Sequence, residues 1–179
     1  MAGRVLRPER FQRHRRRGVG GLDPHQGAPL GSRRKRGAFD NAIGRSRGGR
    51  TTKVHAITDE RGRPRAFVVT AGQVHDIVGA EALLDRVPAP QFLIADRAYD
   101  ARRLRDWLTE RGCQPVIPPN PTRKHPHDYD RVIYRSRNLV ERMFCRLKDF
   151  RRIATRYDKR IDTYISAIFI AATLTWWLN

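Results

Sequence analysis

The pattern of apolar and polar positions predicts a β-hairpin early in the chain. Residues 51–58 are rich in β-branched side chains and largely alternate between apolar and polar. Turn-forming residues follow from Asp59 to Gly62, and residues 65–70 resume a strand pattern. Two strands joined by a short turn predict an antiparallel hairpin.

Helices and strands are predicted to alternate after the hairpin. Apolar residues at helical spacing follow Asp76, which can cap a helix that ends at Pro88. The apolar run 92–95 then stops at Asp96, as expected of a parallel strand buried on both faces. Asp100 can cap the next helix.

The second half of the chain completes the predicted order. A short strand at 115–118 precedes a polar loop, a helix over about 137–150 and an apolar, buried helix over about 161–178. Strands that alternate with helices indicate an α/β fold, and the hairpin makes its sheet mixed. In contrast, residues 1–43 show neither period and are rich in Arg, Gly and Pro, so we predict a disordered basic arm before a domain at 44–179.

Composition adds a polyanionic partner to this picture. The 179 residues contain 37 Lys and Arg against 18 Asp and Glu, a net charge of +19. Such a charge favours nucleic acid, although an RNA-binding protein of ribosomal type or a membrane-surface protein would also carry it. The longest apolar stretch, 164–178, is shorter than the roughly 20 residues that a membrane span needs, and no secretory signal is visible. We therefore expect a cytoplasmic protein without a membrane partner.

The predicted helix 137–150 has one polar stripe. At 100° per residue, Arg137, Lys148 and Glu141 fall at about 0°, 20° and 40°, with Tyr134 near 60° if the helix reaches it. The apolar residues occupy the opposite side. This stripe is either an ordinary solvated face with charge pairs or part of a site.

Asp96 favours the second interpretation of that stripe. Ligands bind at the carboxyl ends of strands in α/β sheets, where Asp96 is predicted to lie, although an Asp there can also be a simple cap. A strand-end carboxylate and Glu141 could together bind Mg²⁺, a hard ion that prefers oxygen ligands. Two-metal phosphodiester chemistry needs further carboxylates, so we expect a third.

Four residues at fixed spacing resemble a known family. Tyr134, Arg137, Glu141 and Lys148 are similar to the Tyr-Arg-Glu-Lys signature of DDE transposases of the insertion sequence four and five type. Residues 93–100 resemble that family's second-acid motif, and segments 44–55 and 70–76 extend the resemblance. It covers the chain from about residue 44 to residue 179.

The resemblance implies an RNase H-like fold, a mixed sheet with flanking helices, and a DNA transposase of a bacterial insertion sequence. Asp96 and Glu141 would be the second and third catalytic acids and would bind Mg²⁺ or Mn²⁺. Tyr134, Arg137 and Lys148 would bind DNA. The implied partners are double-stranded DNA, both terminal repeats and target, and further copies of the chain bound to that DNA near the bacterial nucleoid.

The first acid of this family has no clear counterpart in the chain. It is expected on an apolar first core strand, whereas Asp23 lies between glycines and Pro24, Asp40 lies in Ala38-Phe39-Asp40-Asn41, and neither segment predicts a buried strand. We therefore expect that the first core strand is missing through truncation or a frame shift. The alternative to an active transposase is an inactive remnant that binds DNA non-specifically, and an RNA-binding protein is a third hypothesis.

Overall fold

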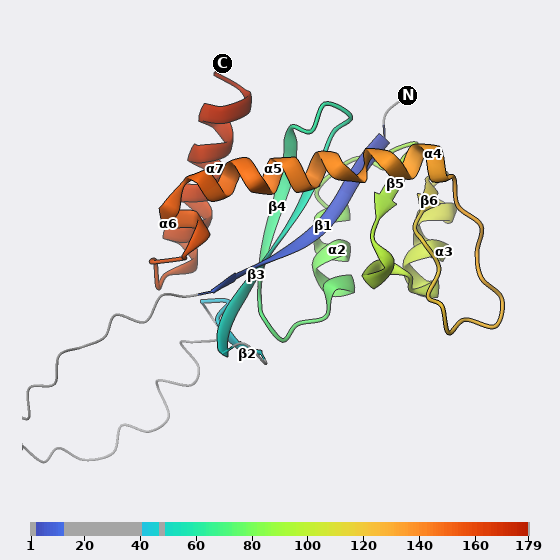
Figure 1. Ribbon diagram of the computed structural model, residues 1–179, viewed down its shortest axis with the longest axis horizontal. Helices are drawn as coiled ribbons and strands as arrows, with labels where there is room; N and C mark the ends of the chain where they lie inside the picture. Colours follow the sequence, from blue (N-terminus) through green and yellow to red (C-terminus); the bar gives the residue numbers. More distant parts are fainter. Residues whose placement is uncertain (1–2, 13–40, 47–48, 179) are drawn as a thin grey trace, which may run out of the picture.

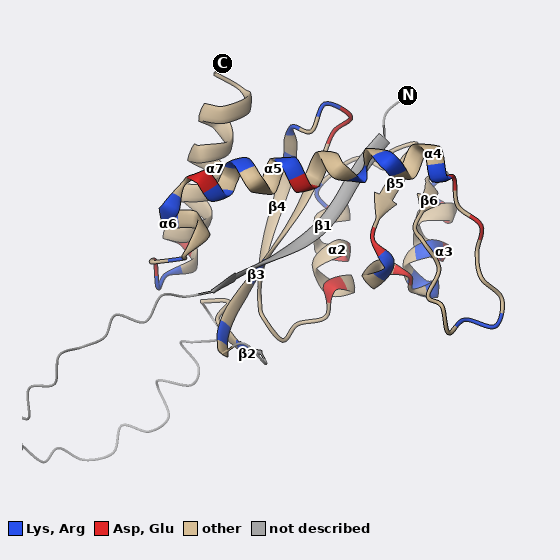
Figure 2. Cartoon of the chain, viewed as in Figure 1, with Lys and Arg blue, Asp and Glu red and all other residues tan. Residues whose placement is uncertain are grey.

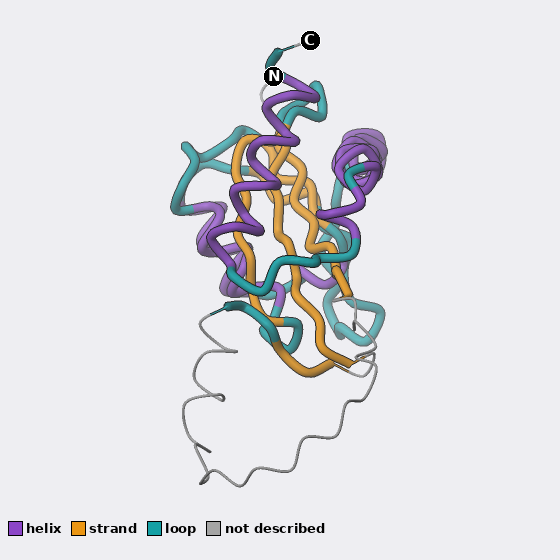
Figure 3. The backbone as a smooth tube through the Cα atoms, turned by 90° about the vertical axis from the view of Figure 1, so that its left-hand side faces the viewer, coloured by secondary structure: helices purple, strands orange, loops and turns teal. Residues whose placement is uncertain are grey.

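The computed structural model describes residues 3–12, 41–46 and 49–178. It shows a mixed sheet with helices on both faces (Figures 1 and 3). The strands are β1 Gly3–Gln12, β2 Gly44–Ser46, β3 Gly49–Thr58, β4 Pro64–Ala71, β5 Phe92–Ala95 and β6 Gln114–Val116. The helices are α2 Asp76–Leu84, η1 Arg97–Tyr99, α3 Arg102–Glu110, α4 Arg131–Tyr134, η2 Arg135–Arg137, α5 Asn138–Asp149, α6 Arg151–Ala154 and α7 Ile161–Trp176.

The sheet contains the predicted hairpin and the predicted parallel strands. β3 pairs antiparallel with β4, β1 and β2, while β1 pairs parallel with β5 and β5 with β6. The hairpin turn closes through a hydrogen bond from Gly62 N to Asp59 O at 3.0 Å, with Gly62 at a φ of 76°. Glycine fits that position because other residues are strained at positive φ.

Strand β1 differs from the sequence-based expectation of a disordered arm and a missing first core strand. Gly3–Gln12 lies at the centre of the sheet, with β3 on one side and β5 on the other. The arginines and Pro8 of β1 obscure the alternation of apolar and polar residues that is typical of a strand. Backbone pairing with β3 and β5 stabilises the strand despite this weak local propensity. Residues 13–40 of the predicted arm lie outside the described residues.

Two hydrophobic clusters hold the helices against the sheet. Residues of β3 alternate between them, since Val54 and Ala56 belong to one and Ile57 to the other. The first cluster joins the sheet to α5, α6 and α7, with Met143, Phe144, Leu147, Tyr164 and Ile168 among its buried members. The second joins the sheet to α2 and α3, with Leu83, Leu84, Leu104 and Leu108.

Two predicted helix caps are wrong. The N-cap of α2 is His75, while Asp76 lies in the first turn and forms an ion pair with Lys53 at 2.6 Å. The N-cap of α3 is Ala101, and Asp100 binds arginines instead. In both cases a tertiary ion pair takes the carboxylate away from the helix terminus.

Helix α7 is less buried than its apolar sequence predicts. It buries Tyr164, Ile168, Ala171 and Ala172, but Ile170 is 62% exposed. Other exposed apolar residues of this region are Phe150, Phe169, Leu174, Trp177 and Leu178. One face of α7 is therefore open to solvent. In the described part of the chain, no helix has the length and apolar character needed to cross a bilayer.

Arg156 connects the start and the end of the domain. Its buried guanidinium donates to Ala42 O at 2.9 Å and to Asn41 O at 2.5 Å, and lies over the ring of Tyr164 at 4.8 Å. These contacts hold Arg156 against residues 41–42, which are far from it in the sequence, beside β2.

Candidate active site at the end of β5

Asp96 lies where the buried strand β5 ends, as predicted. The strand residues Leu93, Ile94 and Ala95 are buried, and Asp96 is the first half-exposed position after them. Its carboxylate accepts a hydrogen bond from Ala98 N at 2.9 Å and caps η1. The cap fixes the carboxylate at the edge of the sheet.

Glu141 lies on α5, in the polar stripe that the helical wheel predicts. Val140, Met143, Phe144 and Leu147 are buried against the sheet, which confirms the predicted apolar face except for the exposed Phe150. The carboxylate of Glu141 forms an ion pair with Arg137 at 2.7 Å, and both side chains are about one-third exposed. Water, metal or DNA can therefore reach this pair.

Tyr134 connects the helix stripe to Asp96. Burial raises the pKa of the Tyr134 phenol above its ordinary value; the charge of Arg137 opposes this shift and the charge of Asp96 adds to it. The guanidinium of Arg137 also lies over the Tyr134 ring, at 5.8 Å from its centroid. Both charged groups are thus close enough to Tyr134 to act on it, and η2 packs against β5 beside them.

Lys148 is on the same helix but farther from β5. It is exposed, and seven residues of helix separate it from Glu141, a rise of about 10 Å. The structure thus brings Asp96, Tyr134, Arg137 and Glu141 into one region and leaves Lys148 two turns along the stripe. This spread suits an extended polyanion better than a small molecule.

Comparisons with known proteins identify the family of the chain. The family model "Transposase DDE domain" matches residues 24–176. The chain belongs to the DDE transposase family. Over 127 residues it is 34% identical to the "Putative transposase for insertion sequence element IS6501" of Brucella ovis, covering 70% of this chain and 98% of that protein. Over 148 residues it is 30% identical to the "Putative transposase for insertion sequence element IS402" of Burkholderia cepacia, covering 76% and 67%. The resemblance inferred from the sequence is thus confirmed.

The family implies an RNase H-like fold and a divalent metal. The carboxylates of Asp96 and Glu141 are the right type of ligand for such a metal, but they are fewer than a two-metal site needs. Asp96 and Glu141 offer the oxygen ligands that Mg²⁺ and Mn²⁺ prefer. No group of three or more His, Cys, Asp or Glu that could hold a metal occurs among the described residues. The two candidates for the first acid, Asp23 and Asp40, lie outside those residues.

The backbone register of β1 can be compared with that of β5 up to the last residue before Asp96. Leu6 pairs with Ala95, so Arg7 follows on β1 as Asp96 follows on β5. The one acidic residue of β1 is Glu9, whose register partner on β3 is Val54. In a DDE transposase an acid is expected on this strand, but the position beside Asp96 holds an arginine.

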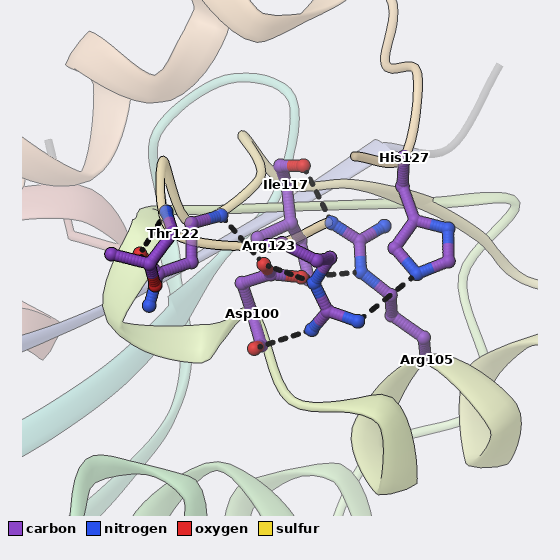
Figure 4. A network of polar contacts seen from close by, with 7 residues as sticks. Asp100, Arg105, Ile117, Thr122, Arg123 and His127 are labelled. Carbon is purple, nitrogen blue, oxygen red and sulfur yellow. Dashed lines mark hydrogen bonds and ion pairs between the residues drawn. The ribbon is translucent and has the colours of Figure 1, made fainter. Parts of the chain in front are cut away.

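The sequence did not reveal the cluster around Asp100. The Asp100 side chain is 1% exposed and forms ion pairs with Arg105 at 2.8 Å and Arg123 at 3.2 Å. It also accepts a hydrogen bond from Asn120 N at 2.7 Å (Figure 4). The cluster fastens the loop between β6 and α4 to η1 and α3. Only Arg105 is near Asp100 in the sequence, so no local pattern identifies the set.

Proposed function

We propose that this chain is a transposase of a bacterial insertion sequence that cuts DNA at terminal repeats and joins the cut ends to target DNA. Asp96 and Glu141 bind Mg²⁺ or Mn²⁺ in this proposal. The observation that carries it is that η2, which ends at Arg137 beside Glu141, packs against β5, the strand that ends just before Asp96. The family membership supplies the substrate class.

The side chains around the two acids have distinct tasks. In the free protein, Arg137 forms an ion pair with Glu141. A DNA phosphate competes for the guanidinium of Arg137. When the phosphate binds there, the carboxylate of Glu141 becomes available to a cation. Tyr134 positions Arg137 through its ring, and Lys148 contacts the backbone farther along the duplex. When bound, the divalent ions stabilise the attacking and leaving oxygens of phosphodiester transfer.

Cleavage of labelled duplexes that carry the element's terminal repeats tests this proposal. We expect cutting with Mg²⁺ or Mn²⁺, none with EDTA, and a loss of at least a hundredfold in Asp96→Ala and Glu141→Ala. Asp106→Ala is the matched control, because that carboxylate lies exposed on α3 in a loose pair with Arg102. Cutting that survives both site variants would overturn the proposal.

A second candidate function is DNA binding without catalysis. The observation that favours it is Arg7 at the β1 position next to Asp96, where an acid is expected. This candidate predicts that the chain binds duplex DNA, with affinity that falls steeply as salt rises, but cuts no repeat under any metal condition. Mn²⁺ binding that is unchanged in the double variant Asp96→Ala, Glu141→Ala would instead favour an RNA-binding protein.

A further inference from the structure

A small basic pocket lies between the β3–β4 hairpin turn and α5. It has a volume of about 160 Å³ and is lined by Arg61, Arg142 and Arg146, with Leu139 and Trp176 among its apolar residues. Gly62 brings the turn close to α5, since a Cβ there would lie only 3.5 Å from Leu139. Figure 2 shows basic segments on the turn and on the neighbouring part of α5.

The pocket is separate from the Asp96–Glu141 region. Arg142 and Arg146 are one turn apart and fall at about 140° and 180° on the helical wheel where Arg137 is at 0°. They therefore lie on a side of α5 away from Glu141, with Asp149 beside them at about 120°. Glu141 and Lys148 lie on the same helix as Arg142 and Arg146, so helix geometry fixes the spacing between them.

The positive charge of the pocket is not neutralised within the described residues. No Asp or Glu lines the pocket, and no ion pair engages the guanidinium groups of Arg61, Arg142 and Arg146 in the described part of the chain. The nearby carboxylate of Asp59 is occupied by Arg63 at 2.8 Å. Three guanidinium groups around one pocket repel one another, and an anion between them relieves that repulsion.

A second pair of arginines lies on the same hairpin, against Trp177 at the end of α7, and one of them, Arg63, is also paired with Asp59. Arg63 and Arg65 of the hairpin stack on Trp177, at 4.9 Å and 5.9 Å from the ring. Arginine forks match phosphate oxygens, and an exposed indole offers a flat surface to a sugar or base. The chemistry suits one phosphate within a nucleic acid backbone.

We propose that this pocket binds a backbone phosphate of duplex DNA, as a second contact besides the Asp96–Glu141 region. The inference rests on the proposed function for the identity of the polyanion. It assigns to Arg61, Arg142 and Arg146 the role of holding the duplex in register along α5. Such contacts set position and affinity rather than sequence preference.

The test compares two double variants in duplex binding as a function of salt. We expect Arg142→Ala with Arg146→Ala to weaken binding of a 30-base-pair duplex at least tenfold and to lower the salt slope by about two, since each phosphate contact contributes about 0.9. Arg102→Ala with Arg111→Ala removes the same charge from α3 and its C-cap on the opposite face of the sheet, and should weaken binding less than threefold. Equal weakening by both double variants would overturn the proposal, because net charge alone would explain it.

Fluorescence of Trp176 gives an independent measurement. A variant with Trp107→Phe and Trp177→Phe leaves Trp176 as the one tryptophan, and its emission should change on addition of duplex. No change, with binding intact, would also overturn the proposal. If the unmodified chain binds no duplex, the result contradicts both the proposed function and the role of the pocket. If it binds duplex and the two double variants weaken binding equally, the result contradicts only the role of the pocket.

Discussion

Two aspartates four residues apart, Asp96 and Asp100, have opposite surroundings. Asp100 is buried and has two arginines and a backbone N–H around its carboxylate. Burial would raise its pKa, but the hydrogen bonds from Asn120 and Arg105 and the charges of both arginines outweigh burial and lower it. Asp96 is half-exposed and caps the short helix η1.

The difference separates a carboxylate that holds the fold from one that can serve a ligand. A buried carboxylate whose two oxygens both accept hydrogen bonds from arginines or backbone cannot accept a metal without breaking the structure around it. A strand-end carboxylate at the surface can change partners at small cost. The buried Asp100, with arginines on both carboxylate oxygens, is therefore the structural aspartate.

Removing Asp100 should have the largest effect on stability. Asp100→Ala leaves Arg105 buried without its carboxylate, and we expect the free energy of unfolding to fall by about 3–5 kcal/mol in urea titrations. Asp106→Ala, which breaks an exposed pair on the same helix, should change it by less than about 0.5 kcal/mol. A small effect of Asp100→Ala would remove the contrast between the two aspartates.

Acid titration should distinguish Asp100 from another buried group, His55. Burial lowers the pKa of His55 from 6.5 to about 4, with Asp76 opposing and Lys53 adding to the shift. The unfolded chain then binds the extra proton, so stability should fall by about 2–3 kcal/mol as pH drops from 6.5 to 4. Asp100, with a lowered pKa, contributes stability that is lost only below about 3.8.

Urea unfolding at pH 7, 5, 4 and 3 measures both windows. His55→Gln should remove the loss between pH 6.5 and 4 and leave the loss at lower pH. A wild-type stability that stays constant from pH 6.5 to 4 would contradict the assignment to His55.

Asp96→Ala should change function more than stability. We expect Mn²⁺ affinity to fall at least tenfold in calorimetric titrations, while the free energy of unfolding falls by about 1 kcal/mol, the usual cost of a lost cap. A loss of stability as large as that of Asp100→Ala would contradict this prediction, because both aspartates would then serve mainly to stabilise the fold.

Arg137→Ala should have the smallest effect. Its pair with Glu141 is about one-third exposed on each side, so the free energy of unfolding should change by no more than about 0.5 kcal/mol. Duplex binding should weaken a few-fold, with a salt slope lower by about one. An unchanged salt slope would show that Arg137 contacts no phosphate.

Local patterns were sufficient for part of this molecule. The run 92–95 predicted β5 with its correct ends, because a strand buried on both faces has a continuous apolar sequence. The periodicity of α5 placed Glu141 and Arg137 on one exposed stripe, because helix geometry alone relates those positions. These two elements carry Asp96 and Glu141, whose roles in the candidate site stay predictions.

Features that depend on distant partners could not be predicted in this way. β1 is a strand because β3 and β5 pair with it, and its own residues, Pro8 among them, indicate no strand. Asp100 has a partner 23 residues away, Arg123, which no local period marks. The exposed face of α7 could not be predicted, because an apolar sequence predicts burial without indicating which element covers it.

The link between Arg156 and Ala42 has a consequence for the order in which the protein is made. The guanidinium and the carbonyl that it binds are 114 residues apart in the chain. A ribosome completes β2, β3 and the hairpin long before Arg156 is synthesised, so this contact can form only late in translation. We expect nascent chains that end before α6 to leave residues 41–43 open to proteolysis, and longer chains to protect them.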